Sequence, residues 1–114
     1  MRTNFQMEYQ NIYMVKGDTL AFNVEVTDQN GDVILADTVD MTCKKDALGE
    51  NVVFHKSLTD GIVQSDGLIT VRVAPEDTQE ADAGRYFYDL QIGVDSDVYT
   101  LMIGTLTLEQ DVTV

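Results

Sequence analysis

Apolar and polar residues alternate along most of the chain, which is the two-residue period of a β-strand with one buried face. In residues 20–26, the apolar side chains on one face are Leu20, Phe22, Val24 and Val26. The same alternation recurs in residues 39–44, 68–73, 85–93 and 98–109. This spacing predicts seven or eight short strands and no long helix, which is typical of an antiparallel β-sandwich.

The alternation also predicts which side chains face the core. The expected inward rows after residue 26 are Val39, Met41 and Cys43, then Ile69, Val71 and Val73, then Tyr86, Tyr88, Leu90 and Ile92. Residues 52–57 leave two choices open, because Val52 with Phe54 and Val53 with His55 are equally suitable inward pairs. In residues 98–109, Leu101 and Ile103 share one parity whereas Leu106 and Leu108 share the other. A bulge near Gly104 would place both pairs inside.

Turn signals divide these segments. Asn30-Gly31 predicts a type I′ hairpin, with a short return strand over 33–35. Residues 75–84 begin with the only proline and carry acidic residues directly after it, which predicts one short helical turn. We therefore expect one sandwich domain over residues 11–114.

Residues 1–10 are expected to form an arm or a strand extension ahead of the first sandwich strand near 12–15. Phe5, Met7 and Tyr9 alternate with polar residues, so the segment has strand character. Two interpretations stay open. The arm is either an edge strand that pairs with another subunit, with these three side chains as assembly contacts, or the first part of a longer first strand.

Composition narrows the function classes. The chain has 114 residues, with 20 acidic against 7 basic side chains and a formal charge of −13. Such acidity argues against binding to nucleic acid or anionic membrane, because both are polyanions. No run of 18 apolar residues and no apolar signal segment is visible in the sequence. We expect the chain to fold in the cytoplasm where it is synthesised.

The sequence offers little catalytic chemistry. His55 is the only histidine, and no serine or cysteine stands in a local arrangement that suggests an activated nucleophile. Cys43 is the only cysteine, so we expect a buried apolar role, no disulfide and no zinc cluster. Asp28-x-Asn30-x-Asp32 resembles the start of a Ca²⁺ loop but lacks its closing glutamate. We therefore predict no enzyme, no cofactor and no metal.

Residues 82–88, DAGRYFY, resemble the Asp-x-Gly-x-Tyr-x-Cys segment of immunoglobulin domains, with Tyr88 at the cysteine position. The resemblance implies a tyrosine corner made by Asp82, Gly84 and Tyr86, in which the phenol packs inside and its hydroxyl bonds upstream backbone. The sequence departs from antibody domains in having no Trp and no disulfide. Phe87 points away from this inward row, and it is either a lone exposed residue or part of a contact surface.

A wider resemblance rests on the order of six segments, which are KGDTLAFNVEV, DQNGD, VDMTCKK, GLITVRVAPEDT, AGRYFYDLQI and GTLTLEQDVT. Over about residues 14–113 the chain resembles tail-associated immunoglobulin-like proteins of phages and prophages, and it is similar to the N-terminal domain of baseplate upper proteins. The resemblance implies a non-catalytic virion structural protein. Such a protein docks in several copies with other phage structural proteins on the tail, the baseplate or the capsid surface. The alternative is a bacterial cell-surface adhesion or carbohydrate-binding module of similar fold.

Overall fold

The structure, a computed structural model, describes residues 7–27 and 30–110. Alternating sequence segments become strands, and the described residues contain nine of them with one short helix. In chain order these elements are β1 (Glu8–Tyr9), β2 (Ile12–Val15), β3 (Leu20–Glu25), β4 (Thr38–Lys44), β5 (Val52–Ser57), β6 (Ile62–Ser65), β7 (Leu68–Val73), α1 (Pro75–Thr78), β8 (Gly84–Val94) and β9 (Asp97–Glu109).

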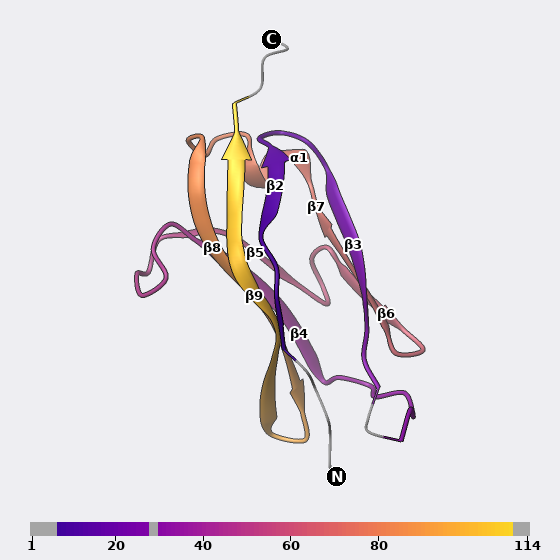
Figure 1. The fold of residues 1–114 in the computed structure, drawn as a ribbon. Coiled ribbons are helices and arrows are strands. Elements are labelled where there is room, and N and C mark those ends of the chain that lie inside the picture. The colour runs from indigo at the N-terminus through magenta and orange to yellow at the C-terminus, as the bar shows by residue number, and fades with distance from the viewer. Residues whose placement is uncertain (1–6, 28–29, 111–114) are drawn as a thin grey trace.

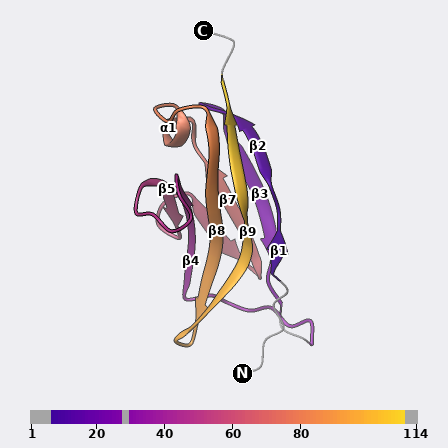
Figure 2. The same ribbon diagram turned by 60° about the vertical axis from the view of Figure 1, so that its left-hand side comes forward.

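Two sheets form the body of the protein. The larger sheet has the order β1-β9-β8-β4-β5, and β2 continues along β9 after β1. The smaller sheet has the order β3-β7-β6. Figures 1 and 2 show the two layers facing each other. Since the chain has one cysteine, no disulfide joins the layers within it. The prediction of an all-β sandwich without a disulfide is confirmed.

The core lies between the two sheets and includes the predicted inward rows of β4, β7 and β8. Each of these positions on β4, β7 and β8 is buried: Val39, Met41, Cys43, Ile69, Val71, Val73, Tyr86, Tyr88, Leu90 and Ile92. Strict alternation therefore identified the inward faces of these three strands correctly. The row on β3 is different, because Leu20, Phe22 and Val24 are only half-buried.

The N-terminal strands pair parallel to the C-terminal strand. Glu8 and Tyr9 of β1 pair with Met102 and Ile103 of β9, and β2 pairs with the same strand from Ile12↔Leu106 onward. The described part of the predicted arm, residues 7–10, thus contains a short strand of its own, β1, which precedes β2 along β9. The alternation indicated strands but could not show that this pair is parallel.

The structure decides the open choice in residues 52–57. Phe54 and Lys56 face inward and are buried, whereas Val52 and His55 are exposed. Because one buried position of this row is a lysine, the alternation of apolar residues does not identify the inward face of β5. Its ion pairs, described below, explain how the sheet accepts it.

The strand β9 contains a bulge, but at Leu101 and not near Gly104. The pairing of β8 with β9 shifts between Leu90↔Met102 and Gln91↔Thr100, so the additional residue is Leu101. Leu101 and Met102 are both buried as a result, and Ile103 points outward. The expectations of a bulge near Gly104 and of an inward Ile103 are therefore wrong.

The other connections are short. Residues 33–35 form no strand of their own; Val33 makes an isolated antiparallel bridge with Thr27. The predicted helical turn is α1, where the Asp77 carboxylate accepts a hydrogen bond from the Ala74 N–H at 2.7 Å. No helix in the part of the chain that the structure describes is long and apolar enough to cross a bilayer.

Candidate functional site

Tyr86 lies on the inward face of β8, close to the strand's first residue. Its side chain is buried, and its hydroxyl donates a hydrogen bond to the Asp82 carbonyl oxygen at 2.7 Å. Gly84, between the two, has φ +151°, a backbone conformation that other residues rarely adopt. Burial raises the pKa of Tyr86, and the charge of Asp82 raises it further. Asp82, Gly84 and Tyr86 therefore lie together, and the Tyr86 hydroxyl bonds the upstream backbone at Asp82.

A second tyrosine fixes the N-terminal segment to the larger sheet. The Tyr88 hydroxyl donates to the Gln10 carbonyl oxygen at 2.7 Å, and the Gln10 N–H donates to Ile103 at 3.0 Å. A side-chain carbon added to Gly104 would collide with that same Gln10 carbonyl. Glycine at this position lets the link between β1 and β2 lie against β9.

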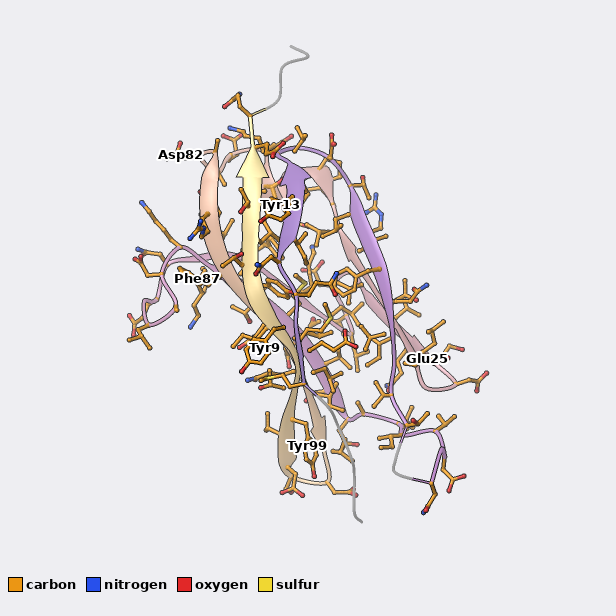
Figure 3. All side chains as sticks on the ribbon, viewed as in Figure 1. Tyr9, Tyr13, Glu25, Asp82, Phe87 and Tyr99 are labelled. Carbon is orange, nitrogen blue, oxygen red and sulfur yellow. The ribbon has the colours of Figure 1, made fainter. Side chains whose placement is uncertain are left out.

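The predicted assembly contacts lie partly on the outer face of the larger sheet. Tyr9 is 80% exposed, Phe87 is 37% exposed, and Ile103 pairs with Tyr9 on the same face. Phe87 and Ile103 border a small hollow on this surface. Tyr13 on β2 is also exposed, as Figure 3 shows with Tyr9 and Phe87. Phe87 thus has an apolar neighbour, which favours the contact-surface interpretation over a lone residue.

The remaining two predicted contacts are less informative. Met7 is 37% exposed and directly precedes β1. Phe5 lies outside the described residues.

An open groove of about 750 Å³ lies between the two sheets, and we call it the β2–β3 groove. One wall comes from β1, β2 and their link, and the other comes from β3. Its apolar lining consists of Ile12, Leu20, Phe22, Val24 and Met102. Glu8 and Glu25 are its charged lining residues within the described chain. In Figure 3, Tyr9 and Glu25 mark the two walls near the same end.

Both walls of this groove are edges of sheets. β3 pairs with β7 on one side, and β2 pairs with β9 on one side; no described strand pairs with the other side of either. Leu20, Phe22 and Val24 are the inner row of β3, yet each keeps part of its surface in contact with solvent. The sandwich is therefore apolar and unpaired along one side, a combination that favours addition of a strand.

An ion cluster forms around the buried side chain of Lys56. The Lys56 ammonium lies 2.8 Å from the Asp77 carboxylate of α1 and 3.4 Å from Asp60. Burial lowers the pKa of Lys56, but the hydrogen bond to Asp77 and the charges of Asp77 and Asp60 outweigh burial and raise it. The pairs connect β5 to α1 and to the turn after β5. The sequence interpretation missed this cluster, because nothing local relates positions 56 and 77.

The residues considered for chemistry lie apart. His55 Nε2 is 2.8 Å from Asp40 Oδ1 on the exposed face of β4 and β5. Cys43 is fully buried, and burial raises the pKa of its thiol to about 12, so its thiolate is strongly disfavoured. Within residues 7–27 and 30–110 no group of three or more His, Cys, Asp or Glu side chains could hold a metal ion. Asp28 of the Ca²⁺-like motif lies outside those residues.

Comparison with known proteins adds no relative. No protein-family model matches the sequence. A search of curated proteins also finds no match. The functional assignment therefore depends on the residues and their geometry.

Proposed function

We propose that this chain is a non-catalytic structural protein of a bacteriophage particle, a docking module of the tail or baseplate, or of the capsid surface. It assembles in the host cytoplasm in several copies with other phage structural proteins and becomes part of the virion. It needs no cofactor, and its partners are proteins.

One observation carries this proposal, the β2–β3 groove. Two unpaired strand edges with a half-exposed apolar row between them suit attachment of another polypeptide through backbone hydrogen bonds and alternate side chains. The resemblance to tail-associated immunoglobulin-like proteins over about residues 14–113 supplies the phage context. Because the formal charge is −13, free copies repel one another until a specific contact forms.

An adhesion or carbohydrate-binding module is the second candidate. The exposed rings of Tyr9 and Tyr13 favour it, since aromatic side chains with a polar tip are common at binding surfaces. Under this alternative, the outer face of the larger sheet would bind a glycan and the groove would have no partner.

The test is incorporation into particles. An epitope-tagged chain is expressed in the host bacterium during phage production, and virions are purified by density gradient and labelled with gold-conjugated antibody. We expect the chain in the particle fraction, with the label at a constant position on each virion. A chain absent from purified particles, but binding a glycan on an array and losing that binding on Tyr9→Ala, would replace our proposal with the second candidate.

A further inference from the structure

The β3 wall of the β2–β3 groove lacks a neighbour that its side chains are suited to meet. In the register of the smaller sheet, Phe22 pairs with Val71, which is fully buried, whereas Phe22 itself is half-buried. The apolar inner face of this sheet thus extends as far as β3, which is the last strand on that side within the described chain. One additional strand beside β3 would cover the exposed half of the row.

We propose that residues 1–6 of a second copy of this chain bind in the groove as that strand, antiparallel to β3. The inference rests on the proposed function, under which several copies meet on one particle. It adds the identity of the partner and the way in which the two copies join.

The sequence of residues 1–6, MRTNFQ, fits the site in length and in pattern. Six extended residues span about 20 Å, as do the six residues of β3. Met1, Thr3 and Phe5 share one face, and Arg2, Asn4 and Gln6 share the other. Phe5 can therefore enter the groove while the polar residues face solvent.

Charge selects the register. The segment holds one basic residue and no acidic one, whereas the charged groove lining in the described chain is Glu8 and Glu25. Placing Arg2 opposite Glu25 puts Thr3 opposite Val24, Asn4 opposite Asn23 and Phe5 opposite Phe22. This single register aligns the opposite charges and brings both aromatic rings to the same face.

The same register requires a second copy. Gln6 would lie opposite Ala21, about 13 Å along β3 from Glu25. Glu8 of the same chain lies at the Glu25 end, where Figure 3 shows its neighbour Tyr9. Two Cα steps from Gln6 to Glu8 reach at most about 8 Å. A chain therefore cannot place its own segment in its own groove in this way.

Cysteine cross-linking tests the register directly. Full-length Asn4→Cys and Asn23→Cys chains are mixed in equal amounts and oxidised, while the wild-type Cys43 stays buried in both. We expect a covalent dimer of the two variants, at a yield at least tenfold above that of Asn4→Cys mixed with Val63→Cys. Val63 is exposed on the same sheet two strands from the groove. Equal yields in the two mixtures would overturn the proposal.

A charge exchange tests the Arg2–Glu25 contact in solution by sedimentation across a concentration series. Glu25→Arg should weaken self-association roughly fivefold, because it places two cations opposite each other. Adding Arg2→Glu should restore the wild-type affinity, whereas Glu50→Arg in an exposed loop should not weaken association. Equal weakening by Glu25→Arg and Glu50→Arg, or no rescue, would contradict the contact.

The outcomes separate this inference from the proposed function. Chains that enter phage particles but do not cross-link in the predicted pair would refute the arm exchange and leave the virion role standing. Chains that cross-link as expected but are absent from particles would refute the virion role alone. A cross-link within one chain of an Asn4→Cys/Asn23→Cys double variant at high dilution would show that the segment fills its own groove, which also refutes the exchange.

Discussion

Tyr86 and Tyr88 are successive inward residues of β8, and each hydroxyl donates to a backbone carbonyl outside the strand. Tyr86 closes the connection that enters β8, and Tyr88 holds the N-terminal segment at Gln10. Such a hydrogen bond stabilises the fold at one specific place in an otherwise apolar row, because removing the hydroxyl leaves the carbonyl without its donor. These two bonds join parts of the chain that alternation alone cannot relate.

At Tyr86, we expect Tyr86→Phe to lower the free energy of unfolding by about 1 kcal/mol, since the Asp82 carbonyl loses its donor while the ring still packs. Urea denaturation measures the change. Tyr13→Phe is the matched control, because the Tyr13 side chain is 68% exposed. Equal stability of Tyr86→Phe and wild type would show that the hydrogen bond contributes nothing to the fold.

Individual residues show where prediction from sequence ends. Asp82, Gly84 and Tyr86 were found because the corner is local, within five residues. Lys56 was missed because its partner Asp77 is 21 residues away, and a lysine in an alternating segment reads as solvent-facing. Phe54 lies in the same inward row as Lys56, so a pattern that places lysine in solvent could not assign Phe54 to the core.

Among the elements, β9 departs most from a simple strand. It pairs with β8 on one side and carries β1 and β2 in succession on the other. The bulge at Leu101 turns Leu101 and Met102 both inward, and Met102 is the first residue of β9 that pairs with β1. Gly104 follows, where the link between β1 and β2 comes close.

We expect Gly104→Ala to displace that link, because the new methyl group would collide with the Gln10 carbonyl. The amides of β1 and β2 should then lose protection in hydrogen exchange, and unfolding should become easier by about 1–3 kcal/mol. Val98→Ala, an exposed change on the same strand, should leave both quantities near wild type. Unchanged protection at residues 8–15 would contradict the close approach.

The β2–β3 groove could not be predicted from the alternation of apolar and polar residues within each strand. The row Leu20, Phe22 and Val24 reads as a strand with one fully buried face, and it forms that strand. Its partial exposure results from the position of β3 at the edge of its sheet. Strand order depends on contacts between distant segments, so the sequence identified the strand but not the groove beside it.

At the scale of the whole molecule, ionisable groups in the interior resist losing their protons. Burial raises the pKa of Cys43 to about 12 and that of Tyr88 to about 12, and the pKa of Lys56 is raised by its carboxylate partners despite burial. Each group binds its proton more tightly in the folded chain than in the unfolded one. Over the alkaline range in which these groups ionise in the unfolded chain, the folded state is therefore more stable at lower pH than at higher pH.

We expect the free energy of unfolding to fall as pH rises above 9, where the unfolded Cys43 thiol begins to ionise and the folded one does not. Each such group contributes a decrease of at most about 1.4 kcal/mol per pH unit. Urea denaturation at pH 8, 9, 10 and 11 measures the slope, and Cys43→Ala should make it shallower. A stability that rises over this range would be incompatible with these raised pKa values.

The parallel pairing of β1 and β2 with β9 has a consequence for synthesis on the ribosome. The strands β1 and β2 are synthesised well before β9, the strand with which both of them pair, since Ile12 pairs with Leu106. Until residues 97–109 emerge from the exit tunnel, the apolar side chains of residues 12–15 have no sheet to join. The nascent polypeptide must therefore keep β1 and β2 unpaired until β9 has been made, and the larger sheet can close only after that.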